Sequence, residues 1–559
     1  DYRFGRPVRW LLALFGGDIV PVAAFGLAAG RTTFGHRFLH PGTLEVRDPA
    51  AYLDALRAAH VVADQNERRR MVVEQVAAAA VERGGRVVAD DELTDIVNYL
   101  IEWPTAIPGG FGERYLDLPR EVIVTALREH QRFYAVERPD GALLPCFITV
   151  RNGDARGVDT VRKGNEDVLV ARLDDARFYW DTDLKHKPAE MVDKLGGVVW
   201  MEGLGSLRDK ATRLESLAGW LGERLDRTAR EAAVRAALLC KTDLLGEMIG
   251  SGKEYASLEG VMGGHYARRA RESDAVAAAI AEHYSPRGAG DEPPFSAAGA
   301  LLALADKLDH VAGAFVAGKS PSGSEDPYGV RRAANGAIRI LIERDWALDL
   351  RAAAMEMTRP FFAADPDLPQ AEIMKKLGEF LRSRVDTALE ERGLAYDMRE
   401  AALEARILMN GVARPGWCDA ADVLARARAL EAFRGDARFA PLVLLFKRVS
   451  NILKAASEAL PPALDTTRLA EAHEQALLAA TELARARTTD RWEKRDYAVI
   501  LPELLGMGDA IHGFFDNVMV NVEDAAVRQN RLRLLADVRE LFLRGWDLSR
   551  AVVEGEPRG

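Results

Sequence analysis

Apolar residues recur every three or four positions along most of the chain, a spacing that predicts a mainly helical protein. The stretch 302–341 shows this most clearly. Its first half places Leu304, Leu308, Val311 and Phe315 on one face of a helix that is expected to end near Val316. After a Gly-, Ser- and Pro-rich turn, a second helix is expected from Asp326-Pro327, because Asp favours the N-cap and Pro the first helical position. The buried face of that second helix is expected to hold Val330, Ala334, Ala337, Ile338 and Leu341.

Residues 1–185 depart from this helical pattern and predict an α+β region. Short β-like runs at 8–15 and 19–25 meet at Gly16-Gly17-Asp18, and 143–150 reads as a buried strand. A long helix is expected after Asn165, which suits an N-cap. Its predicted buried face holds Leu169, Leu173, Ala176 and Trp180.

The rest of the chain predicts three helical regions in succession. We place a helical domain at 186–345, a helical linker or body region at 346–425 and a compact helical domain at 426–559. The fold class expected is therefore multidomain and mainly α, with an N-terminal α+β region.

Composition narrows the partners that such a chain would take. Its 559 residues carry 75 Lys and Arg against 85 Asp and Glu, a net charge of −10, so any nucleic-acid site must be a local basic patch. The three cysteines show no CxxC spacing, which suits a reducing cytoplasm. No apolar run is expected to cross a membrane, and no signal peptide is recognised. The first residue is Asp1 rather than Met, and we expect an N-terminal truncation.

One nucleotide-binding pattern occurs, Gly313-x4-Gly318-Lys319-Ser320, which matches a P-loop. A P-loop lies between a strand and a helix, so that backbone N–H groups converge on the phosphates. Here the preceding residues have a helical pattern and the following residues form a turn. A P-loop NTPase is therefore the weaker of two alternative functions.

The other alternative is a metal-dependent phosphohydrolase of the HD type. Weak metal-ligand candidates in the helical region are His265, His283, Asp243 and Asp306. Enzymes of that type need an adjacent His-Asp pair, and this chain has no His-Asp dipeptide. Lys241-Thr242-Asp243 stands where the pair would be expected, and a cation at Lys241 would compete with a metal. A degenerate, structural helical domain is the competing interpretation.

The last 120 residues hold 16 Lys and Arg against 18 Asp and Glu, so only local strips suit a phosphate backbone. One strip lies on the helix expected at 441–454, where Lys447, Asn451 and Lys454 recur at helical spacing on one face. The candidate RNA-binding side chains of both C-terminal strips are Lys447, Arg448, Asn451, Lys454, Arg528, Arg531 and Arg533. Arg331 and Arg332 are candidates for an RNA contact or a subunit interface.

Several motifs in a fixed order resemble the beta subunit of bacterial glycyl-tRNA synthetase of the α2β2 type, over essentially all of 1–559. They include Lys163-Gly164-Asn165-Glu166, Lys241-Thr242-Asp243-Leu244, Glu282-His283-Tyr284-Ser285-Pro286, Ala305-Asp306-Lys307-Leu308-Asp309 and 321–327 (PSGSEDP) with Arg331-Arg332.

The resemblance implies a B3/B4-like N-terminal region, a degenerate HD-like domain and a C-terminal DALR-type anticodon-binding bundle. The literal DALR motif is altered here, at 523–528. It also implies that this chain holds tRNA(Gly), while an alpha subunit uses ATP and Mg to activate and transfer glycine. We accordingly expect no catalytic residue, cofactor or metal in this chain. The expected assembly is a cytoplasmic heterotetramer that binds neither DNA nor membrane.

Overall fold

The computed structural model describes residues 7–129, 131–250, 254–321, 325–456 and 459–553. The chain forms two compact units, Asp1–Lys187 with Asp243–Arg269, and Pro188–Thr242 with Ala270–Gly559. Residues 243–269 thus belong to the first unit, although they lie within the span expected as one helical domain, 186–345. Sequence periodicity does not reveal this return, because a helix has the same apolar spacing whichever unit it packs in.

Residues 7–47 form small two- and three-stranded sheets in place of the two continuous strands expected. The hairpin of β2 and β3 turns at Gly16-Gly17, where the sequence placed the junction. Strand β5 pairs in parallel with β1 and antiparallel with β4, and β6 pairs with β7. These elements are β1 (Leu11–Leu12), β2 (Leu14–Phe15), β3 (Asp18–Ile19), β4 (Ala23–Ala24), β5 (Leu27–Gly30), β6 (Thr32–Phe34) and β7 (Thr43–Glu45), followed by α1 (Tyr52–Ala58).

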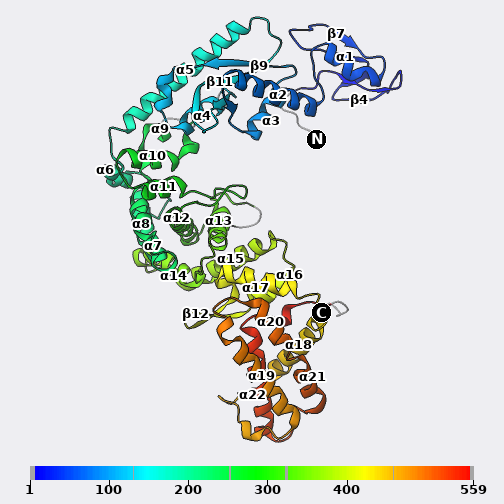
Figure 1. Cartoon of the computed structure of the whole chain (residues 1–559), viewed down its shortest axis with the longest axis vertical. Helices are drawn as coiled ribbons and strands as arrows, with labels where there is room; N and C mark the ends of the chain where they lie inside the picture. Colours follow the sequence, from blue (N-terminus) through cyan, green and yellow to red (C-terminus); the bar gives the residue numbers. More distant parts are fainter. Residues whose placement is uncertain (1–6, 130, 251–253, 322–324, 457–458, 554–559) are drawn as a thin grey trace. The chain divides into compact units, whose positions relative to one another are not determined.

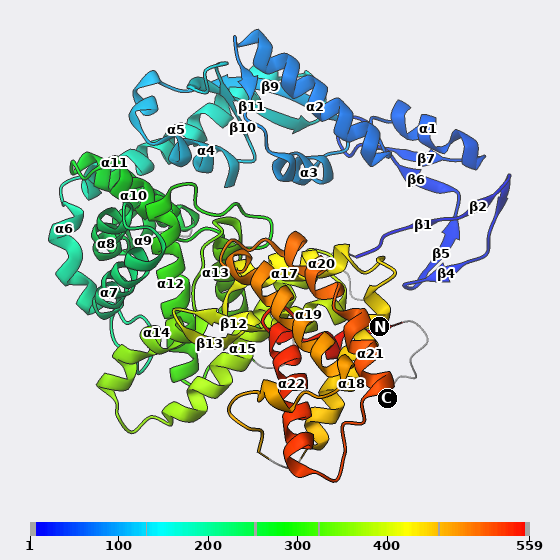
Figure 2. The same cartoon turned by 60° about the horizontal axis from the view of Figure 1, so that its bottom comes forward.

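A four-stranded antiparallel sheet, in the order β8-β10-β11-β9, is the centre of the first unit. Its strands are β8 (Arg86–Val87), β9 (Pro104–Gly110), β10 (Tyr134–Glu137) and β11 (Leu143–Asn152). Successive side chains point to opposite faces. Tyr134 and Ile148 therefore pack with α2 (Gln65–Glu82) and α3 (Asp91–Leu100), whereas Ala135 and Phe147 pack with α4 (Arg120–Glu129) and α5 (Val158–Asp183). The sheet lies between these two helical layers (Figure 2).

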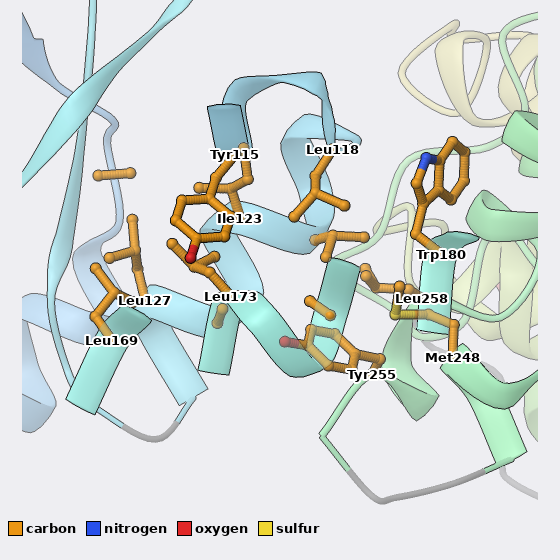
Figure 3. Packing of buried hydrophobic residues seen from close by; sticks show 14 of the residues in the cluster. Tyr115, Leu118, Ile123, Leu127, Leu169, Leu173, Trp180, Met248, Tyr255 and Leu258 are labelled. Carbon is orange, nitrogen blue, oxygen red and sulfur yellow. The ribbon is translucent and has the colours of Figure 1, made fainter. Parts of the chain in front are cut away.

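Helix α5 contributes to the hydrophobic core on the face of this sheet that holds Ala135 and Phe147. Its predicted apolar face, from Leu169 to Trp180, is buried as expected. Side chains from the returning segment, including Met248, Tyr255 and Leu258, pack in the same cluster (Figure 3). That segment contains α9 (Glu247–Gly250) and α10 (Val261–Arg269).

The predicted start of α5 at Asn165 is wrong. The helix begins at Val158, and Asn165 lies inside it. The N-terminal part of α5 is hydrogen-bonded to strand β9. Arg162 Nε donates to Pro108 O at 2.9 Å, and Gly110 N donates to Glu166 Oε1 at 2.9 Å. These tertiary contacts extend the helix beyond the local cap signal.

The second unit is helical and is built around α12, which is buried on all sides. Helix α12 packs against α7, α8, α11, α13 and α14 (Figure 1). The helices of this part are α6 (Pro188–Met191), α7 (Leu207–Leu225), α8 (Arg230–Leu239), α11 (Asp274–Glu282), α12 (Ala297–Val316), α13 (Val330–Glu343), α14 (Leu350–Ala364), α15 (Gln370–Glu390), α16 (Tyr396–Leu403) and α17 (Ala420–Ala432). A hairpin of β12 (Arg406–Met409) and β13 (Val412–Pro415) precedes α17.

Helix α12 ends at Val316, as predicted, but α13 begins at Val330 and not at Asp326-Pro327. Gly329 adopts a left-handed conformation with φ of 67°, so the chain turns once more before the helix. Asp326 still acts on the helix start, because its Oδ2 accepts from Arg331 N at 3.1 Å. The predicted buried face of α13 is confirmed. Residues 322–324 of the intervening turn lie outside the described residues.

The C-terminal part is a bundle of α18 (Phe439–Ala455), α19 (Ala472–Thr488), α20 (Tyr497–Leu505), α21 (Gly508–Asn517) and α22 (Ala525–Leu543) (Figure 2). Contrary to the sequence expectation, residues 497–517 are apolar enough and long enough to span a membrane by composition. In the structure this stretch forms two helices, and Leu501, Leu504 and Phe514 are fully buried in the bundle. Its apolar character is accounted for by core packing. The predicted fold class, mainly helical with an N-terminal α+β region, is confirmed.

Candidate functional site

A cluster of buried charged and polar side chains occupies the helical core of the second unit, where the sequence suggested a degenerate HD-type site. Lys241 follows α8, His283 caps the end of α11, and Asp306 lies on α12. Lys241 Nζ is 2.9 Å from His283 Nε2 and 3.1 Å from Asp306 Oδ1. His283 Nδ1 lies 2.6 Å from Ile280 O and must donate to it, so Nε2 is the ring acceptor for Lys241.

A second lysine completes this cluster from α7. Lys210 Nζ lies 3.0 Å from Asp306 Oδ1 and 2.9 Å from Asp309 Oδ2. Arg213 Nε lies 2.6 Å from Asp309 Oδ1. Burial and then the Lys241 charge lower the pKa of His283 well below its ordinary value. Burial alone would raise the pKa of Asp306, but Lys210 and Lys241 together hold that pKa well below its ordinary value. The centre therefore pairs ammonium groups with carboxylates around a neutral imidazole.

These contacts put ammonium groups where a metal would have to lie. The His283 lone pair and the Asp306 carboxylate, two ligands of the metal hypothesis, both bind Lys241. The other two candidates belong to the first unit. Asp243 Oδ2 accepts from Gly260 N at 2.6 Å at the start of α10, and His265 Nε2 lies 2.9 Å from Glu121 Oε2. No group of three or more His, Cys, Asp or Glu suited to a metal occurs in the described ranges.

Lys210 is a member of this cluster that the sequence reasoning missed, as is Arg213. A usable signal was present: Lys210 falls three residues after Leu207 and four before Leu214, on the apolar face of α7. A lysine on such a face is buried only when a carboxylate meets it. Here Asp306 and Asp309 supply that pairing, and the Lys210 ammonium also lies 4.5 Å from the centre of the Trp200 ring.

The structure explains Gly313, Gly318 and Lys319 of the P-loop pattern by helix packing and by the helix end. Gly313 lies within α12, and a Cβ there would be 2.4 Å from the Trp200 ring. Gly318 ends the helix in a left-handed conformation with φ of 69°. Its N donates to Phe315 O and Lys319 N donates to Ala314 O, the two bonds of a Schellman motif. The Lys319 ammonium lies 4.9 Å from the centre of the Tyr328 ring. A helix precedes the pattern, as predicted, and not a strand.

Helix α18 carries the first strip of candidate RNA contacts. Arg448, Asn451 and Lys454 are exposed, and Lys447 is half-buried. The Arg448 guanidinium lies 4.3 Å from the centre of the Phe515 ring of α21. A guanidinium stacked in this way keeps its in-plane N–H donors available. Within the described part of the chain, neither Arg448 nor Lys454 has a carboxylate within 4 Å.

The cations of α22 are more closely tied to the bundle itself. Arg531 is only 6% exposed, with Nε 2.6 Å from the fully buried Glu474 and Nη1 2.7 Å from Met519 O. Arg533 pairs with Asp537 one turn along the helix. Arg528 is half-buried, and its Nη1 donates to Val522 O at 2.7 Å. Arg531 is therefore a structural cation, and we do not carry it into the RNA-binding surface.

The two arginines that begin α13 differ in their contacts. Arg331 is half-buried and its Nη1 donates to Glu325 O at 3.0 Å, whereas Arg332 is exposed. These observations do not test the prediction that Arg331 and Arg332 contact RNA or another subunit, which stays a prediction.

An all-helical C-terminal bundle with exposed cations on α18 is the architecture expected of an anticodon-binding protein. Residues 444–548 match the DALR anticodon binding domain, which assigns that class. Residues 1–404 match the glycyl-tRNA synthetase beta subunit family. Because this second match covers well over half of the chain, the chain belongs to the glycyl-tRNA synthetase beta subunit family.

Curated relatives agree with this assignment. The glycine–tRNA ligase beta subunit of Desulforamulus reducens is 40% identical over 99% of this chain and 78% of the relative. That of Myxococcus xanthus is also 40% identical, over 99% of this chain and 78% of the relative. That of Pseudomonas aeruginosa is 38% identical over 98% of this chain and 78% of the relative. The family is that of an aminoacyl-tRNA synthetase subunit.

Proposed function

We propose that this chain binds and positions tRNA(Gly) as the non-catalytic beta subunit of a glycine–tRNA ligase. An alpha subunit would carry out the ATP-dependent activation of glycine and its transfer to the tRNA. The observation that carries this proposal is the anticodon-binding bundle at the end of a chain of this family, with Arg448 and Lys454 exposed on its surface.

The bundle has a surface suited to hold RNA by its backbone. Exposed cations neutralise phosphates and release counterions, which gives affinity that falls as salt rises. Asn451, between the two cations on α18, adds a neutral donor and acceptor for a base or a sugar. Anticodon bases are unstacked in a loop, so they are read by stacking and by hydrogen bonds to their edges. The Arg448 guanidinium, already stacked on Phe515, offers both a charge and a planar surface.

The partner of this chain would be the alpha subunit of the same ligase, in an α2β2 heterotetramer. ATP and Mg would bind to that subunit, and the buried Lys241 centre would serve only to hold the helices of the second unit together. We place the assembly in the cytoplasm, which agrees with three buried cysteines that form no disulfide.

The deciding experiment is glycine charging of tRNA(Gly) by the chain alone, by the alpha subunit alone and by the two mixed. We expect charging only in the mixture. Charging by this chain alone would contradict the proposal. Stoichiometric Mn, Fe or Zn in the purified chain, lost on His283→Ala, would instead favour the hydrolase alternative. Nucleotide binding lost on Lys319→Ala would favour the NTPase alternative.

A further inference from the structure

Helices α13 and α15 pack side by side in the second unit, and α17 packs against α13 (Figure 1). Arg331 and Arg339 lie two helical turns apart on α13, and Arg384 on α15 is two turns from Arg392, which follows the last turn of that helix. Arg331 is close enough to Arg384, and Arg339 to Arg392, for the charge of one to act on the other. Two rows of arginines therefore run in the same direction along neighbouring helices, with about 11 Å between the members of each row.

Arg384 and Arg392 use few of their hydrogen-bond donors within the protein. Both side chains are half-buried. Arg384 Nε donates to Ser383 Oγ at 3.2 Å and Arg392 Nη1 donates to Ala388 O at 2.8 Å, so each guanidinium spends one of its five N–H donors. In the described ranges no carboxylate lies within 4 Å of either guanidinium. Arg384 also lies 5.6 Å from the centre of the Phe380 ring, a contact that orients the guanidinium plane.

The charged neighbours of these two arginines include further cations. Burial, and then the charge of Arg331, lower the pKa of Arg384 below its ordinary value. Burial also lowers the pKa of Arg392; the charge of Glu343 opposes this shift, and that of Arg428 on α17 adds to it. Arg428 is exposed and has no carboxylate within 4 Å in the part of the chain that the structure describes. Holding half-buried cations beside like charges costs free energy, which a bound anion would offset.

The nearby carboxylates leave this positive charge largely uncompensated. Those with the largest effects on Arg384 and Arg392 are Glu343, Asp326, Asp386 and Glu391. Three of them are bonded to other groups, Glu343 to Arg339 at 2.6 Å, Asp386 to Arg399 at 2.7 Å and Asp326 to Arg331 N at 3.1 Å. Glu391 is exposed, and no cation of the described residues lies within 4 Å of it. This single carboxylate stands beside four cations that we call the arginine strip, Arg331, Arg384, Arg392 and Arg428.

We propose that the arginine strip binds the phosphodiester backbone of tRNA, as a second contact of this chain besides the exposed cations of α18. This inference rests on the proposed tRNA-binding function and extends it to a region outside the anticodon-binding domain at 444–548. Guanidinium groups bind phosphate oxygens through paired N–H donors, and Arg384 and Arg392 both keep donors for such pairs. Contacts of this kind position an RNA without reading its sequence.

The arrangement favours an RNA backbone over an acidic protein surface. A backbone presents negative charges in a line, and the strip presents cations in rows along two parallel helices. The whole chain carries a net charge of −10, so a nucleic-acid site on it requires a local basic patch of this kind. An acidic surface of the alpha subunit is the competing occupant.

The test compares the full chain with Arg384→Gln, Arg392→Gln and Glu391→Gln. Arg359→Gln is the matched control, because Arg359 is an exposed arginine of α14 that pairs with Glu356 at 2.6 Å. Filter binding of tRNA(Gly) and of a non-cognate tRNA is measured at several salt concentrations, with and without the alpha subunit. Thermal unfolding checks that each variant is folded, and size-exclusion chromatography measures its association with the alpha subunit.

We expect Arg384→Gln and Arg392→Gln each to weaken tRNA binding about tenfold and to lower the slope of log affinity against log salt by about 1. The two tRNAs should lose affinity by the same factor, because a phosphate contact carries no sequence information. Glu391→Gln removes the nearby negative charge and should instead strengthen binding, by about two- to fivefold. Arg359→Gln should bind as wild type does.

Unchanged affinity and salt slope in both arginine variants would overturn the proposal. Wild-type tRNA binding combined with lost association with the alpha subunit would also overturn it, and would make the strip a subunit interface. The two proposals fail in different ways. If the wild-type chain binds no tRNA, the tRNA-binding function fails and the strip assignment fails with it. If Arg448→Gln weakens tRNA binding while the strip variants bind as wild type does, the strip assignment fails alone.

Discussion

The ammonium group of Lys241 lies 2.9 Å from Nε2 of His283 inside the helical core of the second unit. This contact bears on two interpretations of the same sequence region, a metal-dependent hydrolase and a structural helical domain. A metal-dependent hydrolase would use the His283 lone pair as a metal ligand, whereas here the lone pair accepts a hydrogen bond from a cation. Lys210 adds a second ammonium 3.0 Å from Asp306, so repulsion would oppose a divalent ion at this place.

Replacing Lys241 by Met should destabilise the second unit by about 2–4 kcal/mol, because it leaves His283 Nε2 buried without a donor and weakens the balance of charge at Asp306. Urea denaturation followed by tryptophan fluorescence measures this change. Lys194→Met is the control, since Lys194 is exposed in the same unit, and it should change the stability by less than about 0.5 kcal/mol. An equal response of the two variants would show that the buried network contributes nothing.

Gly313 gives a prediction that separates packing from nucleotide binding. Gly313→Ala should lower the free energy of unfolding by about 1–3 kcal/mol, because the new Cβ would lie 2.4 Å from Trp200. Gly219→Ala, in α7, meets its nearest atom at 3.6 Å and should be neutral or stabilising by up to about 1 kcal/mol, as Ala favours helices. Thermal unfolding compares the two. If Gly313→Ala left stability intact, the packing account of this glycine would be wrong.

Arg448 and Lys454 should act on RNA binding without acting on the fold. Changing each to Gln should weaken tRNA(Gly) binding and lower the slope of log affinity against log salt by about 1 per phosphate contact. Filter binding at several salt concentrations measures both. Arg468→Gln is the control, because Arg468 is exposed in the same bundle but paired with Asp465 at 2.9 Å. The surface assignment fails if the control lowers the slope as much as the two variants.

Arg531 should give the opposite response, although it was also a candidate for tRNA binding. Its guanidinium is buried against Glu474, so Arg531→Gln leaves a buried carboxylate unpaired and should cost about 3–5 kcal/mol of stability. Chemical denaturation of the variant measures this cost. Unaltered stability together with weaker tRNA binding would return Arg531 to the RNA-binding surface.

Asp419 makes a pH-dependent contribution to stability. Burial, and then repulsion from Asp422, raise its pKa from 3.8 to about 6. The folded state therefore binds this proton more tightly than the unfolded state, and stability falls as pH rises from about 4 to about 6. The loss is at most about 3 kcal/mol, from ~1.4 kcal/mol per pH unit between the two pKa values.

Asp419→Asn keeps the cap acceptor for Asp422 N and removes the titration. Urea denaturation at pH values between 4 and 7 should show a smaller fall for the variant than for wild type. Identical pH profiles would mean that Asp419 does not titrate in this range, for instance because the Arg495 guanidinium holds it charged.

The order of motifs and the helical periodicity were sufficient to predict the mainly helical class, the helix ending at Val316 and the family. Helix periodicity is a local property, so the buried faces of α5 and α13 follow from spacing alone. Capping signals were less reliable. Asn165 and Asp326 both have the residue type of a cap, yet α5 begins before the first and α13 after the second, because tertiary contacts and Gly329 set those ends.

The candidate site divides in the same way. Sequence placed Arg448, Asn451 and Lys454 on one helix and predicted that Lys241 would compete with a metal, since both statements need only spacing and residue type. It did not distinguish Arg531 from these cations, because whether an arginine meets water or a buried glutamate depends on a helix 57 residues away in the chain. Only the folded chain brings Arg331, Arg384 and Arg428 into one strip, since they come from three separate helices whose packing no local pattern encodes.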